Sequence, residues 1–306
     1  MRITALGGGH GLSATLRAAR LLSTDVTAVV SMADDGGSSG RLRDEFDVPP
    51  PGDVRMALLA LSDATDLQRQ VWGHRFAGDG PLAGHNLGNL VLTALWQQAG
   101  SAEKVVVAGI AQAGRMLGSV GQVLPVSTHR YHLQAHGRAT DGTTSDIVGQ
   151  SLVNVTTLSI TGLGTQPSGI PACPEALTAI AGSDVVVLGP GSWFTSVLAP
   201  LCIDGVVDAI SRSEAHVILV LNLRPQQGET SGYEPADYLH SLRALYPSVQ
   251  IGTLLADDSC ASEVRPVADG LGWRVVSGHF ADDSGAVHRP TALAEALKEA
   301  CEVLTK

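Results

Sequence analysis

The sequence predicts an α/β fold with a Rossmann-like, doubly wound and mostly parallel sheet. Short apolar segments alternate with segments whose apolar residues recur at helical spacing, which is typical of βαβ units. Two apolar segments, Asp184–Leu188 and His216–Leu221, are almost continuous in apolar residues, as parallel strands buried on both faces are. We expect a single domain over residues 1–306, with a β-rich insertion at about residues 121–163.

The first unit combines a strand at Ile3–Leu6, a glycine loop at Gly7–Gly11 and a helix at Leu12–Leu22. Glycine lets the backbone turn sharply and approach a ligand closely, and the free N–H groups at a helix N-terminus favour phosphate. A tight turn alone needs one glycine, whereas four of these five residues are glycine. We therefore predict that the loop binds nucleotide phosphates, with Gly9 and Gly11 closest to the ligand. The candidate residues are Gly8, Gly9, His10 and Gly11.

The second strand, Val26–Val30, leads into the adjacent carboxylates Asp34 and Asp35 and then into small residues. If the first two strands are parallel neighbours, both loops leave the same sheet edge. Adjacent acidic side chains beside an anionic ligand predict either a bound cation or a contact with a sugar hydroxyl. The alternative is that both face solvent and only shape the turn. We interpret this segment as a flexible loop with the binding candidates Asp34, Gly37, Ser38, Ser39 and Arg41.

Asp53 follows three consecutive prolines and is expected to cap a helix at Val54–Leu61. A carboxylate at this proline-fixed turn is also a candidate ligand for a metal ion or a sugar hydroxyl. The candidate Mg²⁺ ligands are Asp34, Asp35 and Asp53.

A helix is predicted over Gly84–Trp96, with His85, Asn86 and Asn89 at its first turn. Two interpretations are equally supported: a polar helix start near solvent, and a row of hydrogen-bond donors for a nucleotide or sugar. Another helix is expected over Lys104–Leu117.

The predicted insertion is rich in Thr and Val, and a hairpin turn is expected at Asp141-Gly142. Four strands are expected, over residues 122–127, 130–136, 142–148 and 153–162. His132 and His136 alternate on one strand face without a carboxylate or Cys at matching spacing, so we expect a solvated face rather than a metal site.

The second half of the chain repeats the strand-to-loop pattern twice. The loops Gly189–Ser196 and Asn222–Thr230 each follow a buried strand, which predicts one composite cleft with the first loop. Their candidate ligand-binding residues are Gly189, Gly191, Ser192, Asn222, Glu229 and Thr230. The sheet is completed by helices at 176–181, 235–246 and 291–304 and by strands at 250–255 and 273–277.

Composition limits the partners. The net charge of -10 argues against nucleic acid and against an anionic membrane surface. The four cysteines are scattered, which is typical of buried thiols in a reducing compartment. No signal peptide or spanning segment is recognisable, so a cytoplasmic location is expected.

The motifs together resemble the YvcK family, the so-called gluconeogenesis factors, which are relatives of the CofD phospholactate transferases. The matching segments, which span most of the chain in order, are Gly7–Leu12, Ala33–Arg43, Pro50–Arg55, Gly84–Asn89, Gly189–Ser192 and Gly228–Thr230. Three features depart from the family pattern. Gly149-Gln150 stands where members often have Gly-Glu, His288-Arg289 stands where they often have Arg-His, and the region between Leu255 and Trp273 is short.

The resemblance implies a UDP-N-acetylglucosamine-binding regulator needed for cell shape, cell-wall synthesis and growth on gluconeogenic carbon, with no settled catalytic reaction. Proteins of cell-wall synthesis or signalling are the implied partners. Whether the chain forms a homo-oligomer is left open. The rival is a Mg²⁺-dependent transferase of the CofD type, which moves a phospholactyl group from a nucleotide diphosphate donor to a deazaflavin. A third alternative, an NAD-dependent oxidoreductase, is supported only by the glycine fingerprint at Gly9–Ala14.

Overall fold

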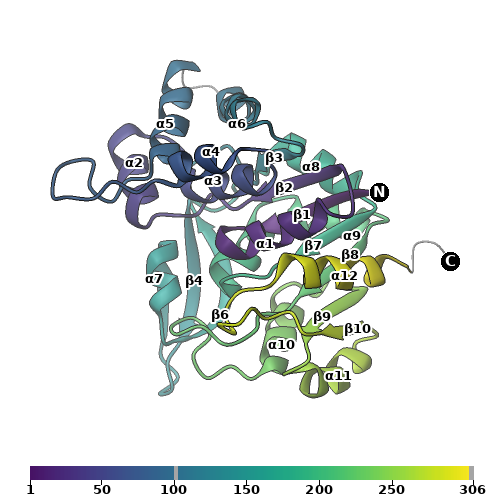
Figure 1. Ribbon diagram of the computed structural model, residues 1–306. Coiled ribbons are helices and arrows are strands. Elements are labelled where there is room, and N and C mark those ends of the chain that lie inside the picture. The colour runs from purple at the N-terminus through teal and green to yellow at the C-terminus, as the bar shows by residue number, and fades with distance from the viewer. Residues whose placement is uncertain (100–102, 303–306) are drawn as a thin grey trace.

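The computed structural model describes residues 1–99 and 103–302 and contains a main sheet of seven parallel strands (Figure 1). The strand order is β10-β9-β8-β7-β1-β2-β3. The bounds are β1 (Arg2–Gly7), β2 (Asp25–Val30), β3 (Gln122–Pro125), β7 (Val185–Leu188), β8 (His216–Val220), β9 (Thr253–Asp257) and β10 (Arg274–Gly278). The order runs outward in both directions from the β1–β7 pair, which confirms the doubly wound, Rossmann-like prediction.

Helices connect these strands and cover the sheet. They are α1 (Gly9–Ala19), α2 (Gly37–Phe46), α3 (Pro51–Ala60), α4 (Asp66–Gly73), α5 (Leu87–Ala99), α6 (Glu103–Leu117), α8 (Pro174–Ala181), α9 (Val206–Arg212), α10 (Pro235–Leu245), α11 (Ala261–Gly270) and α12 (Pro290–Cys301). Two short helices, η1 (Trp193–Val197) and η2 (Ala199–Cys202), follow β7. α1 packs against α3 and α12, and α8 packs against α9. Right-handed crossovers place α1 and α9 on opposite faces, because the strand order runs in opposite directions on either side of β1 and β7.

A second, antiparallel sheet has the order β5-β4-β6. It consists of β4 (His132–Arg138), β5 (Thr144–Val148) and β6 (Ser159–Gln166), with the helix α7 (Gln150–Val155) between the last two strands. The sequence prediction was wrong in two places. The segment at 122–125 is an edge strand of the main sheet, where Val123 pairs in register with Ala28. Part of the segment expected as the fourth strand forms α7.

The two sheets share one apolar core. β7 is buried along its whole length, as expected for a strand covered on both faces. Leu133 and Ala135 from β4 belong to the same cluster of buried residues as Val186 and Leu6 from the main sheet. The small sheet is therefore packed onto the main fold and contributes to the same core.

Two further predictions need correction near the N-terminal loops. The segment expected as a flexible loop after Asp35 is a helix from Gly37 onward. Gly40 packs closely in it, since a Cβ there would lie 2.1 Å from the Asp35 carbonyl oxygen. Asp53 does not cap a helix, because α3 begins earlier, at Pro51, and Pro50 occupies the N-cap position. Asp53 instead lies in the first turn of α3. α11 falls in a segment for which the sequence pattern predicts no element.

Candidate functional site

A cavity of about 780 Å³ lies where the loops after β1, β7 and β8 meet. β1 and β7 are adjacent parallel strands at which the strand order reverses, and ligands of open α/β sheets bind at such a point. The structure therefore brings the three predicted loops into one cleft. The predicted residues that line it are Gly8, Gly9, His10, Gly11, Asp34, Asp53, Gly191, Ser192 and Asn222.

The first loop presents the N-terminus of α1 to the cavity. The first N–H groups of a helix have no acceptor within it. The N–H of Gly9 donates to the carboxylate of Asp53. The N–H groups of His10 and Gly11 belong to the same first turn of α1. The positive end of the helix dipole adds to them, and together they favour an anion such as a phosphate.

The glycines of this loop serve close packing as well as access. A Cβ on Gly8 would lie 2.3 Å from Oδ2 of Asp53. A Cβ on Gly11 would lie 2.0 Å from the carbonyl oxygen of Pro190, in the loop after β7. The close approach expected for Gly11 is therefore an approach of two backbone segments. Gly9 has a φ of +60°, and a Cβ there would meet only one atom, at 4.0 Å. Glycine is therefore favoured at this position by the positive φ and not by close packing.

Asp34 and Asp53 form the acidic side of the cavity. Asp34 accepts hydrogen bonds from the N–H of Gly36 at 3.0 Å and from the Ser39 hydroxyl. Burial raises the pKa of Asp53 to about 7, and the negative charge of Asp34 adds to the effect. Burial also raises the pKa of Asp34. Both carboxylates are therefore poised to take a hydrogen-bond donor or a cation from a ligand.

Asp35 points away from this pair. Its Oδ1 accepts the N–H of Ser151 at 2.8 Å, and its Oδ2 lies 3.9 Å from Nδ1 of His132. Over residues 1–99 and 103–302, no group of three or more His, Cys, Asp or Glu side chains is arranged to hold a metal ion. The predicted trio of metal ligands is thus not assembled, because Asp35 contacts α7 and β4 while Asp34 and Asp53 face the cavity.

The predicted polar row at the start of α5 is buried beneath α2. The Ser38 hydroxyl lies 3.0 Å from Nδ1 of His85 and accepts a hydrogen bond from Asn89 at 3.0 Å. The Arg55 guanidinium donates to Oδ1 of Asn89 at 2.9 Å. Asn86 donates to the Gly73 carbonyl at 2.8 Å. These contacts hold α2, α3 and α5 together and leave the row outside the cavity wall.

The remaining second-loop candidates, Gly37, Ser39 and Arg41, lie outside the cavity wall. The Ser39 hydroxyl accepts the N–H of Gly52 at 3.0 Å, which joins α2 to the start of α3. Arg41 donates to the carbonyl of Ala83 at 2.6 Å. Gly37 is exposed and has a φ of +48°. None of the three lines the cavity.

The loops after β7 and β8 are tied together by Asn222. Its Oδ1 accepts the N–H of Gly191 at 3.2 Å and its Nδ2 donates to the Gly191 carbonyl at 2.8 Å. Gly189 has a φ of +78°, and its carbonyl accepts the Thr15 hydroxyl at 2.8 Å. Asn222 therefore lines the cavity with its amide already paired, and Gly189 lies behind the wall.

Glu229 and Thr230 are buried behind the cavity wall. The Glu229 carboxylate accepts the N–H groups of Phe194 and Thr195 at 3.3 and 3.2 Å and so holds the start of η1. Burial raises the pKa of Glu229 to about 7. The Thr230 hydroxyl accepts the N–H of Gln226 at 2.9 Å. Both residues shape the cavity through the loops that they hold.

Sequence reasoning missed much of the cavity rim. Gln150, Ser151 and Asn154 line it from α7, on one face of the helix. The sequence pattern does not show their shared face, because it predicts a strand from residue 153 onward. The other missed residues are Arg224, Gln226, Gln227 and Ala286–His288. Gln150 and His288 are among the positions where the chain departs from the family pattern, so those departures fall at the rim.

Two features complete the description. His288 is buried, and its Nε2 lies 3.2 Å from the Leu221 carbonyl, which joins the C-terminal loop to the end of β8. None of the helices in the described part of the chain is both long and apolar enough to cross a bilayer.

The fold and the cleft define a doubly wound α/β protein with a cavity at the switch point of its sheet. The family model described as 2-phospho-L-lactate transferase CofD matches residues 3–265. The chain belongs to this CofD family, and within it to the YvcK-type gluconeogenesis factors.

Several relatives carry this resemblance. A putative gluconeogenesis factor from Mycobacterium tuberculosis is 40% identical, with 98% of this chain and 90% of the relative covered. The gluconeogenesis factor of Bacillus subtilis is 35% identical, with 84% and 78% covered. A crystal structure of a UPF0052-family protein from Bacillus halodurans has a TM-score of 0.86 and 34% identity, with 97% of this chain and 98% of that chain covered.

Proposed function

We propose that this protein binds a UDP-sugar such as UDP-N-acetylglucosamine and acts as a cytoplasmic regulator of the gluconeogenesis-factor type. Such a regulator supports cell morphogenesis, cell-wall synthesis and growth on gluconeogenic carbon sources. The observation that carries the proposal is the cavity at the switch point, where the N-terminus of α1 and the Asp34–Asp53 pair face one space. A nucleotide sugar has an anionic centre and several hydroxyl groups, and this wall offers complementary groups to both.

The pyrophosphate lies against the first turn of α1, where the N–H groups of His10 and Gly11 donate to it. Arg224, in the loop after β8, adds a positive charge to the cavity lining. Ribose or sugar hydroxyls donate to Asp34 and Asp53, and each such bond to a charged acceptor contributes roughly 1.5–3 kcal/mol. The amides of Gln226 and Gln227 remain for the base or the sugar substituent.

Titration calorimetry tests the proposal with a panel of UDP-N-acetylglucosamine, other UDP-sugars, GDP, NAD and a deazaflavin. We expect saturable binding of a UDP-sugar without its consumption. Asp34→Asn weakens that binding by roughly 1–3 kcal/mol if the residue accepts a sugar hydroxyl. Asp208→Asn, on the exposed face of α9, is the matched control and leaves affinity unchanged. Binding of NAD alone contradicts the proposal.

The second candidate is a Mg²⁺-dependent transferase of the CofD type, and the pairing of Asp34 with Asp53 favours it. Mg²⁺ is commonly held by one or two carboxylates together with substrate phosphates, so this pair fits the ion. Bound there, Mg²⁺ would offset charge that develops on a transferred phosphate group. In that case EDTA lowers the affinity of the wild-type protein for the nucleotide, and the wild-type protein converts a deazaflavin acceptor. EDTA has no effect on nucleotide affinity in Asp34→Asn or Asp53→Asn. Affinity that ignores EDTA favours the regulator.

A further inference from the structure

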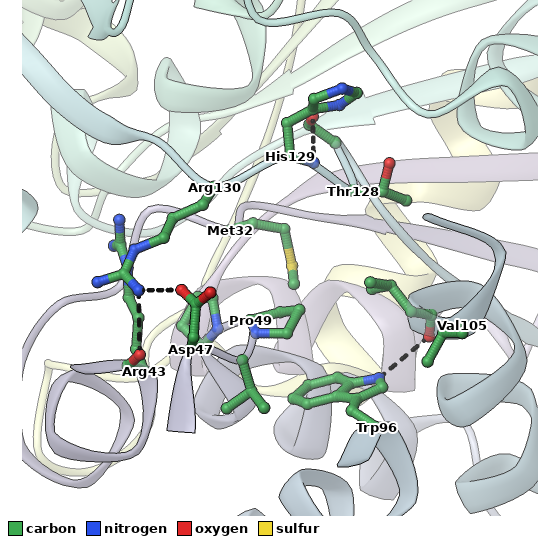
Figure 2. A pocket seen from close by; sticks show the side chains of 13 residues that line it. Met32, Arg43, Asp47, Pro49, Trp96, Val105, Thr128, His129 and Arg130 are labelled. Atoms are coloured by element: carbon green, nitrogen blue, oxygen red, sulfur yellow. Dashed lines mark hydrogen bonds and ion pairs between the residues drawn. The ribbon is translucent and has the colours of Figure 1, made fainter. Parts of the chain in front are cut away.

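A second cavity, of about 290 Å³, lies at the carboxyl ends of β2 and β3 (Figure 2). Met32 lies just after β2, Ser127–Arg130 come after β3, and Val48–Pro50 connect α2 to α3. None of its lining residues lines the nucleotide cleft. It is therefore a separate site on the same edge of the sheet, and nothing in the proposed function uses it.

The floor of this cavity is apolar and held in place. The indole N–H of Trp96 donates to the carbonyl of Val106 at 3.1 Å, which fixes the orientation of the ring. Met32, Pro49 and Val105 complete this part of the wall. Figure 2 shows Trp96 and Val105 at one end of the cavity and Arg130 with Asp47 at the other. An apolar cavity of roughly 150 Å³ is large enough for benzene, so this one has room for a ring with a polar substituent.

The other end of the cavity carries charged side chains. Arg130 donates to the carbonyl of Arg43 at 3.3 Å and pairs with the exposed carboxylates of Asp44 and Asp47. Arg43 is 1% exposed; its Nη2 donates to the Tyr131 carbonyl, but its Nε and Nη1 find no hydrogen-bond partner within residues 1–99 and 103–302. A buried guanidinium without an ion pair is costly, and a nearby anion offsets that cost.

The charged groups at this end leave one cation without a counter-ion. Arg43 and Arg130 contribute two positive charges, and Asp44 and Asp47 contribute two negative charges, but both carboxylates are exposed and pair with Arg130. The buried Arg43 guanidinium has no ion pair within the described residues, and a ligand carboxylate supplies one. We propose that this cavity binds a small organic monocarboxylate, whose apolar body packs on Trp96 and whose carboxylate lies toward Arg130 and Arg43. A phosphate has the charge for this end but no apolar body for the floor.

Sodium benzoate is the probe, and benzamide is its neutral counterpart of nearly equal shape. Calorimetry on the full chain gives saturable benzoate binding in the millimolar range, with benzamide at least about tenfold weaker. Arg130→Gln brings benzoate affinity down to that of benzamide. Because Arg130 is half-exposed, this variant is expected to fold, which circular dichroism verifies. Equal affinity for the two probes, or benzoate affinity unchanged in Arg130→Gln, overturns the proposal.

A cavity-filling variant locates the bound probe. Val105→Phe places a ring in the cavity and abolishes benzoate binding, whereas Val107→Phe makes the same change on α6 outside the cavity and preserves it. Benzoate that binds Val105→Phe as tightly as the wild type lies elsewhere and overturns the proposal. So does the absence of saturable binding to the wild-type protein.

Discussion

Asp53 lines the cleft, and its protonation state depends on its burial there. Its pKa is raised from 3.8 to about 7 by burial first and by the charge of Asp34 second. Between these two values the folded protein binds more protons than the unfolded chain, so the stability that protonated Asp53 contributes falls as the pH rises through 7. Above the folded-state pKa no further loss is expected from this group.

Asp53→Asn is expected to remove this pH dependence, because the amide mimics the protonated acid and still accepts the N–H of Gly9. The variant should melt a few degrees above the wild type at pH 8 and differ less at pH 5. Glu229 also has a pKa raised to about 7, so the measurement is the difference between variant and wild type at each pH. A difference that is the same at both pH values would show that the ionisation of Asp53 is not the cause.

Gly11 provides a second prediction at the scale of one residue. Gly11→Ala adds a Cβ 2.0 Å from the carbonyl oxygen of Pro190, which is backbone and cannot swing away as a flexible side chain can. Overpacking of this kind costs typically 1–3 kcal/mol, and we expect that loss of unfolding free energy in urea. Gly73→Ala is the control, because nothing lies within 4 Å of its Cβ at the end of α4. Equal stability of the two variants would contradict the packing argument.

At the scale of elements, α7 depends on contacts at both ends. Asp35 accepts the N–H of Ser151 at its start, and a Cβ on Gly149 would lie 2.7 Å from the same carboxylate. At its end the Asn154 carbonyl accepts the N–H of Glu229 at 3.2 Å. The second loop and the loop after β8 therefore hold α7 between them, and three of its side chains line the cleft.

Asp35 does not itself line the cleft, and Asp35→Ala is expected to loosen α7. Hydrogen exchange at the N–H of Ser151 should become faster, since its acceptor is removed, while exchange in the buried strand β7 stays slow. If the proposed function holds, UDP-sugar affinity falls with it, because Gln150 and Ser151 lose their fixed position. Asp208→Ala, on the exposed surface of α9, is the matched control. Unchanged exchange at Ser151 would show that Asp35 does not hold the helix.

The sequence predicted strands and their loops better than it predicted what surrounds them. β1, β7 and β8 could be found because their apolar runs end in glycine or amide residues, and this also located three loops of the cleft. β2 could be found because its apolar run leads into two carboxylates and small residues. α2 was missed because Gly37–Gly40 has low helical propensity and is stabilised by tertiary packing. α7 was missed because six residues carry too little periodicity to separate helix from strand. The Asp35 side chain points toward α7, and α7 was not predicted. The adjacent residues Asp34 and Asp35 could therefore not be assigned different roles from their spacing alone.

At the scale of the whole molecule, the cleft joins the main sheet to the small one. The loops after β1, β7 and β8 form one part of its wall. Asp34, Gly36 and Asp53 form a second part, and α7 with the C-terminal loop at Ala286–His288 forms a third. Because both sheets contribute to one core, a ligand in the cleft contacts segments far apart in the sequence. Ligand binding is thus expected to stabilise the whole fold against unfolding. It is also expected to protect the amides of the cleft rim from hydrogen exchange.

Hydrogen exchange with and without UDP-N-acetylglucosamine tests this. At a ligand concentration near 100 Kd, binding to the folded state alone adds roughly 2.7 kcal/mol to the free energy of unfolding. Amides that exchange only by global unfolding, such as those of β7, should slow by that amount. The N–H of Ser151 in α7 exchanges by local opening and should slow only if the ligand holds α7 in place. Amides of β10, at the far edge of the sheet, are the control for local protection by the ligand, since no residue of β10 lines the cleft. Slowing of β7 without slowing of Ser151 would place the ligand on the main sheet alone and remove the insertion from the binding site.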